Sequence, residues 1–245
     1  MANISYFPSV QLLDQSERRS SVRNLSRLLL FKGRDVPFSN DLHRAAVAMF
    51  GEAVVKGTTL SPGVVKREME TAPNGTMSVF SCHALAMEQD VFSSGIFFGT
   101  PGESRLPELA LPELLDINSI ASRLVLLNGC ETALSGIADP ADECLSIANT
   151  FLAGGSRSVI GTQWRANAYS SALWCFSFLE RIRAGNIDAL AASSLTSRWL
   201  RDSSGDDRRN LLYRWKCSPG DVEVLERQDF SHPFHWANHK FHGAP

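Results

Sequence analysis

Short apolar segments alternate along the chain with longer segments in which apolar residues recur at helical spacing. The short segments are bounded by Gly or polar residues and show no alternation of apolar and polar positions. This pattern predicts strands at 28–33, 52–57, 77–82, 95–99, 123–129 and 157–164. The longer segments mostly open with Ser, Asn, Asp or Pro, and they predict helices at 39–51, 61–72, 139–155, 167–186 and 187–202.

Strands that alternate with helices and are apolar on both faces are typical of a mainly parallel sheet covered on both sides. The sequence therefore predicts an α/β fold with one domain over residues 25–245. Residues 1–24, which are polar and rich in Ser and Arg in their second half, are expected to form an N-terminal appendage. We also expect a polar, solvated loop at 202–210 and a last strand within 232–243.

Two of the predicted strands lead into side chains that can carry chemistry. His83 follows the strand at 77–82, and Cys130 follows the strand at 123–129. In open sheets of this class the site lies beyond the carboxyl ends of the strands. Neighbouring strands are only about 4.8 Å apart. We therefore expect the imidazole and the thiol to meet at this edge of the sheet.

A cysteine and a histidine placed together suit acyl transfer. The thiolate is the nucleophile, and the imidazole takes its proton and later gives a proton to the leaving amine. Backbone N–H groups of Ala84 and Cys130 are the candidate donors to the oxyanion. On these residues alone, a cysteine peptidase and a pair of ordinary core side chains both remain open.

Four motifs follow one another along nearly the whole chain. They are FSCHA at 80–84, LVLLNGCETALSG at 124–136, DECLSIANTFLAGGSRSVIGTQW at 142–164 and HPFHWANHKFHG at 232–243. In order and spacing they resemble the CHAT domain family, caspase-like cysteine peptidases related to caspases and separases. The resemblance covers roughly residues 25–243. It implies a three-layer caspase-like fold and a Cys–His dyad, with His83 as the catalytic histidine and Cys130 as the nucleophile.

The chain departs from the family pattern close to the reactive pair. The family usually has Gly after the histidine, where this chain has Ala84, and Ser-Ala-Cys where it has Asn128-Gly129-Cys130. A Cβ at Ala84 could crowd the oxyanion donor, although Ala is the mildest replacement. The pair itself is intact, so we interpret the protein as an active endopeptidase. The alternative is a non-catalytic caspase-like scaffold that retains the pair as a relic.

Further residues are candidates for substrate binding. Glu131, Asp142 and Glu143 could line a pocket that favours a basic residue before the scissile bond, and Trp164 could form a pocket wall. Structural roles remain open for all four. Asp142 and Glu143 would be favourable charges in the first turn of the helix at 139–155. Glu131 could hydrogen-bond the turn after the nucleophile, and Trp164 could belong to the core.

Two other groups of residues look reactive but are expected to be structural. Cys82 precedes His83, and adjacent side chains on a strand point to opposite faces, so we expect Cys82 to pack in the core. The tail carries four histidines with no HExxH motif, and we expect no metal site there: His232, His235, His239 and His242. Without a nucleotide-binding or metal-binding motif, no cofactor is expected.

Composition and charge limit the class of protein and the kinds of partner that the chain can have. The 245 residues are 44% hydrophobic and 20% charged, as in ordinary globular proteins. A formal net charge of −2 argues against binding to nucleic acid or to an anionic membrane. The chain shows neither a signal peptide nor an apolar run of about 20 residues. Five cysteines without a CxxC pair argue against a disulfide framework. We expect a cytoplasmic protein.

The resemblance also implies partners. A caspase-like peptidase acts on a protein substrate, and members of this family are often associated with TPR repeats. No TPR-like repeat is evident in this sequence, so a recruitment module is expected either on a separate chain, as a TPR-containing or other activator protein, or not at all. Relatives of this kind occur in bacterial defence systems, which is the biological setting that the resemblance suggests.

Overall fold

A six-stranded sheet forms the centre of the molecule. The computed structural model describes residues 4–18, 25–51, 54–56, 60–73, 75–87, 89–100, 106–117, 119–134, 145–185 and 187–245. The strand order is β2-β1-β3-β7-β8-β9, and all pairs are parallel except β8 with β9. The strands are β1 (Arg27–Lys32), β2 (Val54–Lys56), β3 (Thr76–Ser81), β7 (Leu124–Leu127), β8 (Ser158–Thr162) and β9 (His239–Gly243).

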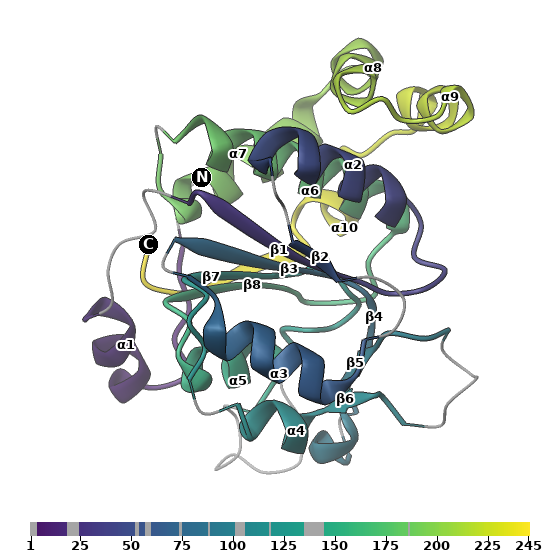
Figure 1. The fold of residues 1–245 in the computed structure, drawn as a ribbon. Coiled ribbons are helices and arrows are strands. Elements are labelled where there is room, and N and C mark those ends of the chain that lie inside the picture. Colours follow the sequence, from purple (N-terminus) through teal and green to yellow (C-terminus); the bar gives the residue numbers. More distant parts are fainter. Residues whose placement is uncertain are drawn as a thin grey trace.

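Helices cover both faces of this sheet (Figure 1). One face carries α2 (Ser39–Phe50), α6 (Ala168–Ala184) and α7 (Ala189–Asp202). The other carries α3 (Pro62–Thr71), α4 (Leu111–Leu115) and α5 (Ile147–Gly154). A small antiparallel sheet continues from the end of β3 and consists of β4 (His83–Leu85), β5 (Gly95–Phe97) and β6 (Leu109–Ala110), with a 3-10 turn at Val91–Ser93. The predicted three-layer α/β fold is confirmed.

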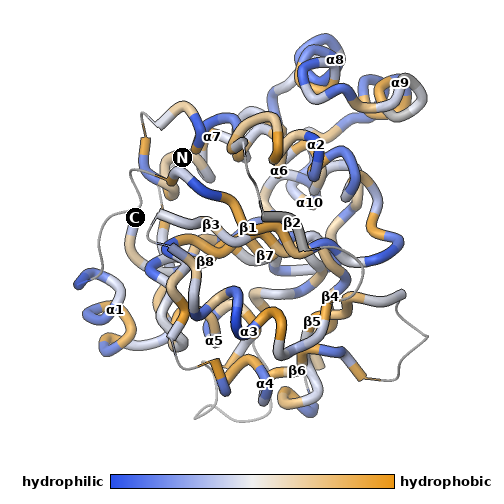
Figure 2. The backbone as a smooth tube through the Cα atoms, viewed as in Figure 1, coloured by the Kyte–Doolittle hydropathy of each residue, from blue (hydrophilic) through white to orange (hydrophobic). Residues whose placement is uncertain are grey.

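The central strands are apolar throughout because both of their faces are buried. In β1, Leu28 and Leu30 pack into the core beneath α2 and α6, whereas Leu29 and Phe31 pack into the core on the side of α3. Successive strand residues point to opposite faces, so a sheet covered on both sides needs a continuous apolar run. Figure 2 shows these strands as mostly hydrophobic segments in the middle of the molecule.

The N-terminal residues extend the sheet at the β9 edge. The Tyr6 N–H donates to the Phe241 carbonyl over 3.0 Å, and the Gly243 N–H donates to the Tyr6 carbonyl over 3.0 Å. Helix α1 (Val10–Glu17) follows, and its Ser16 hydroxyl donates to the Arg157 carbonyl over 2.6 Å. The described residues of the expected appendage at 1–24 are thus tied to β9 and to the turn before β8.

The prediction of a polar loop at 202–210 is wrong. Helix α8 (Gly205–Arg214) occupies this region, and α9 (Pro219–Arg227) packs beside it to form a hairpin that projects from the body (Figure 1). A capping box starts α8: the Asp207 N–H donates to the Ser204 hydroxyl over 3.2 Å, and the Asp207 carboxylate accepts the Ser204 N–H over 2.9 Å. This local signal outweighs the polar composition of the segment.

Two other predicted elements are shorter than expected. The helix expected at 139–155 corresponds to α5, which begins after its N-cap Ser146, and residues 135–144 lie outside the described part of the chain. The predicted strand in the tail corresponds to β9, preceded by a short helix α10 (Pro233–Trp236). Within the described ranges, no helix combines the length and apolar character needed to cross a bilayer.

Candidate active site

The strands that lead into His83 and Cys130 are neighbours. β3 and β7 pair in parallel, and the pairing continues to Phe80 opposite Leu127. β3 ends at Ser81 and β7 at Leu127, so both chains leave the sheet at the same edge. The predicted meeting of these two strand ends is therefore confirmed.

The two chain segments after these strands are in close contact. The Asn128 N–H donates to the Phe80 carbonyl over 2.8 Å. A Cβ placed on Gly129 would lie 2.8 Å from the Cys82 carbonyl oxygen and 3.1 Å from the Ala84 Cβ. The first of these separations is too short for real atoms, so only glycine allows the approach. The absence of a side chain at position 129 brings the turn of the cysteine against the segment of the histidine.

Hydrogen bonds to the end of β8 hold the turn that contains Cys130. Glu131 has a left-handed backbone with φ of 57°, and its N–H donates to the Trp164 carbonyl over 3.3 Å. The Ala133 N–H donates to the Thr162 carbonyl over 2.8 Å, and the Thr162 hydroxyl donates to the Gly129 carbonyl. Fixed on both sides in this way, the turn presents Cys130 in one orientation.

One cavity of ≈ 350 Å³ is lined by both His83 and Cys130. Its walls come from four places in the chain: the loop after β1 with the start of α2, the ends of β3 and β7, and the first half of α6. The lining residues are Asp35, Val36, Pro37, Phe38, Leu42, Ser81, Cys82, His83, Asn128, Gly129, Cys130, Ala166, Ala168, Ser171, Ala172, Cys175 and Phe176. A histidine and a cysteine thus face the same space.

Polar groups of the pair have no partner within the described part of the chain. The His83 Nε2 atom is buried and makes no hydrogen bond there. The Cys130 N–H donates to none of the described acceptors. A buried nitrogen without a partner carries a desolvation cost that a bound carbonyl or amine can remove. The Cys130 N–H therefore suits a substrate carbonyl, while the His83 Nε2 atom is covered by surrounding protein atoms.

The predicted substrate-binding residues lie elsewhere or outside the described ranges. The Glu131 side chain is 18% exposed and forms an ion pair with Arg165, with Oε1 3.5 Å from Nε. The Trp164 indole donates to the Phe234 carbonyl over 3.0 Å and stacks on the Phe234 ring, with centroids 6.3 Å apart. Neither Glu131 nor Trp164 lines the cavity. Asp142 and Glu143 fall outside the described residues, so their binding role stays a prediction.

The other cysteines at the cavity are poor nucleophiles. Cys82 is 4% exposed, its thiol donates to the Phe31 carbonyl over 3.4 Å, and burial raises its pKa well above the ordinary value. Burial likewise raises the pKa of Cys175 to about 12. A thiol with so high a pKa forms almost no thiolate near neutral pH. Cys82 packs in the core, as its place beside His83 predicted.

Sequence reasoning missed most of the cavity wall. Phe38 at the N-cap of α2 and Ala172 in α6 both line the cavity, yet neither belongs to a motif. Asn128 accepts a hydrogen bond from the Ser171 hydroxyl over 2.5 Å, which joins the end of β7 to α6. The one sequence signal for this part of the cavity wall was Asn128, which departs from the family pattern.

Comparison with known families agrees with this geometry. The model of the CHAT domain family matches residues 1–244, nearly the whole chain. The chain belongs to the CHAT domain family. None of the curated protein sequences matches it significantly.

Solved structures of larger proteins are similar in fold to this CHAT domain. It is similar to separase in the Saccharomyces cerevisiae separase–securin complex, with a TM-score of 0.57 and 14% identity, over 99% of this chain and 14% of separase. It is also similar to the Arg-specific cysteine proteinase gingipain R, with a TM-score of 0.50 and 8% identity, over 96% of this chain and 51% of gingipain. The chain therefore has a caspase-like fold and spans only part of these larger proteins.

The tail histidines of the CHAT domain take separate places. His232 caps α10, where its Nδ1 accepts the Phe234 N–H over 3.2 Å. His239 and His242 are buried on β9. Across the described ranges, no group of three or more His, Cys, Asp or Glu residues could hold a metal ion.

Proposed function

We propose that the protein is a cysteine endopeptidase that cleaves a partner protein, with Cys130 as nucleophile and His83 as general base. The observation that carries this proposal is the single cavity lined by both residues at the ends of paired strands. Membership of the CHAT domain family and a fold shared with cysteine peptidases support the same reaction class.

The reaction follows from the chemistry of these groups. His83 takes the thiol proton, and the Cys130 sulfur attacks the scissile carbonyl to form a tetrahedral oxyanion. The Cys130 N–H donates to this oxyanion, with the Ala84 N–H as the second candidate donor. Collapse breaks the C–N bond as His83 gives its proton to the leaving amine. Water activated by His83 then hydrolyses the thioester and releases the acid.

Labelling with a peptide that carries a thiol-reactive acyloxymethyl ketone tests the dyad without requiring turnover. The wild type should be labelled at Cys130, and Cys130→Ala should abolish labelling. His83→Ala should slow labelling by about 10²-fold or more, because the thiolate loses its base. Cys217→Ala removes a buried cysteine outside the cavity and serves as the matched control. Cys130 reactivity equal to that of a free cysteine would favour a non-catalytic scaffold.

We further propose that a partner protein regulates this activity, as the family resemblance implies. A TPR-containing activator is the expected kind of partner. Cleavage of candidate protein substrates should then rise when the activator is added, while Cys130→Ala stays inactive under both conditions. Full activity of the isolated chain, unchanged by any neighbouring TPR protein, would count against regulation but not against the dyad.

A further inference from the structure

The cavity beside Cys130 has an apolar wall formed by residues of α2 and α6. Leu42 of α2 and Ala172, Cys175 and Phe176 of α6 line it, and each of these side chains is buried. Ligand pockets generally combine apolar walls with a few polar groups and have volumes of about 300–1,000 Å³. At ≈ 350 Å³, this cavity has room for one large side chain.

Charged groups are scarce on the cavity lining. Among the described lining residues, Asp35 is the one charged group besides the titratable His83, and it is exposed in the loop after β1, where it accepts a hydrogen bond from the Thr100 hydroxyl. None of the described lining residues is Lys or Arg. An acidic substrate side chain would therefore lose its hydration without gaining a cation partner. A basic side chain would meet only an exposed carboxylate, and exposed ion pairs contribute little.

The remaining polar groups lie at the catalytic end of the cavity. The Ser171 hydroxyl donates to the Asn128 Oδ1 atom over 2.5 Å, so these two side chains partly satisfy each other. Asn128 also lies two residues before Cys130 in the chain and lines the cavity with it. This arrangement separates a polar end, suited to the peptide backbone, from an apolar interior suited to a side chain.

From this lining we infer that the cavity is the specificity pocket of the enzyme, and that it binds a large apolar side chain such as Met or Leu. The inference rests on the proposed peptidase function. During the reaction the acyl half of the substrate is bonded to the Cys130 sulfur. A cavity that contacts this residue therefore takes the side chain immediately before the scissile bond. The predicted preference for a basic residue would not apply.

A panel of otherwise identical peptidyl acyloxymethyl ketones, with Leu, Met, Ala, Arg or Asp at the last position, tests the inference. We expect the Leu and Met probes to label Cys130 about 100-fold faster than the Arg and Asp probes. Ala168→Leu, at the start of α6 on the cavity lining, should slow the Leu probe at least 10-fold and leave the Ala probe almost unchanged. Ala184→Leu, at the exposed end of the same helix, is the matched control.

The outcomes separate this inference from the proposed function. Fastest labelling by the Arg or Asp probe would overturn the apolar pocket and leave the peptidase intact. An equal effect of Ala168→Leu on the Leu and Ala probes would also overturn it. Failure of every probe, both on the chain alone and with candidate TPR-containing activators present, while iodoacetamide still alkylates Cys130, would overturn the proposed function and this inference with it.

Discussion

Residues 84 and 129 lie so close together that a methyl group on one of them crowds a methyl group on the other. The family pattern that the chain resembles places Gly after the histidine and Ala before the cysteine, and this chain has the reverse arrangement. A Cβ at Gly129 would lie 3.1 Å from the Ala84 Cβ, which is tighter than ordinary contact. The two departures therefore compensate each other, since the Ala84 methyl occupies the room that Gly129 leaves. The missing side chain at Gly129 therefore relieves the crowding that the Ala84 Cβ would otherwise cause.

Replacing Gly129 should disturb the site, and a second change should partly restore it. We expect Gly129→Ala to lower the free energy of unfolding by about 1–3 kcal/mol and to slow Cys130 labelling, because the new Cβ meets the Cys82 carbonyl and the Ala84 methyl. Adding Ala84→Gly removes the second contact and should recover part of both losses. Urea unfolding and probe labelling measure the four variants of this cycle. Additive effects of the two changes would contradict the shared space.

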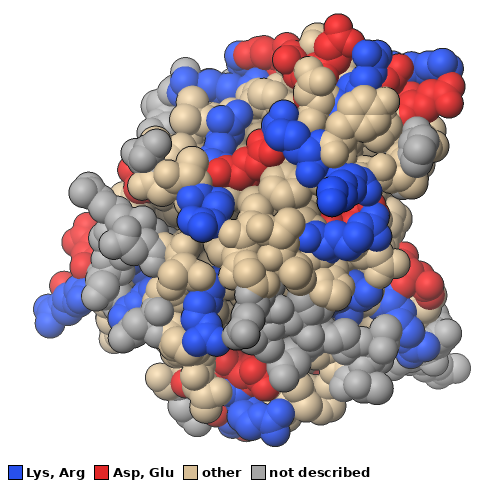
Figure 3. All heavy atoms as spheres, turned by 45° about the horizontal axis from the view of Figure 1, so that its top comes forward, with Lys and Arg blue, Asp and Glu red and all other residues tan. Residues whose placement is uncertain are grey.

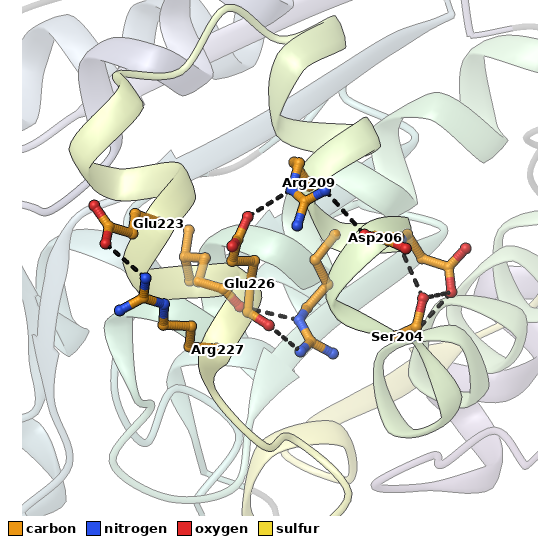
Figure 4. Close-up of polar contacts among 9 residues, drawn as sticks. Ser204, Asp206, Arg209, Glu223, Glu226 and Arg227 are labelled. Atoms are coloured by element: carbon orange, nitrogen blue, oxygen red, sulfur yellow. Dashed lines mark hydrogen bonds and ion pairs between the residues drawn. The ribbon is translucent and has the colours of Figure 1, made fainter.

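At the level of elements, the α8–α9 hairpin depends on one buried arginine. The Arg208 guanidinium donates to the carbonyls of Leu225, Glu226 and Gln228 over 2.8 to 3.0 Å, and also to the Ser203 carbonyl. Ion pairs lie nearer the surface of the same hairpin (Figure 4): Arg209 with Glu226 joins the two helices, whereas Arg209 with Asp206 lies within α8 and Arg227 with Glu223 lies within α9. Buried and exposed contacts of neighbouring arginines can therefore be compared directly.

The two arginines should differ strongly in their contribution to stability. Arg208→Met leaves several buried carbonyl oxygens without donors, and we expect it to lower the free energy of unfolding by about 2–4 kcal/mol. Arg209→Met breaks pairs that remain partly exposed to solvent and should cost about 0–1 kcal/mol. Urea unfolding with hydrogen exchange at the α9 amides would follow both. Equal losses would show that the surface pairs, rather than the buried guanidinium, hold the hairpin.

Across the whole molecule, charged side chains form separate surface groups, and two titratable imidazoles, those of His239 and His242, are buried. On the face shown in Figure 3, Lys and Arg lie in several groups with Asp, Glu and uncharged surface between them. His239 and His242 are buried on β9, and burial lowers the pKa of each to about 3. Below pH 6.5 an unfolded chain would protonate these imidazoles, whereas the folded protein keeps them neutral.

Acid should therefore destabilise the protein before its carboxylates titrate. Because the unfolded state binds more protons between about pH 6.5 and 3, the free energy of unfolding falls as pH drops, by up to about 1.4 kcal/mol per pH unit for each histidine. His239→Phe keeps a ring against Trp174, whose centroid lies 3.8 Å away. This variant should lose about 2 kcal/mol less than the wild type between pH 7.5 and 5 in urea unfolding. Parallel pH profiles would show that His239 is not held neutral.

Much of the fold followed from local pattern. Continuous apolar runs such as 123–129 identified strands buried on both faces, and capping residues marked most helix ends. The polar composition of the α8 segment hid its capping residues Ser204 and Asp207, and part of its stability comes from Arg208, which bonds to carbonyls in α9 and beyond. The sequence of a polar segment does not show which distant groups form hydrogen bonds with its side chains.

The sequence by itself determined that His83 and Cys130 end two strands and that these strands emerge at one edge, because the alternation of apolar strands and helices dictates a parallel sheet. Only the tertiary structure decided what surrounds the pair. Phe38 and Phe176 come from helices far apart in the chain, and they close the cavity that Glu131, turned toward Arg165, does not enter. Local pattern specifies which residues must be buried, but the partner that buries each of them is chosen by packing in three dimensions.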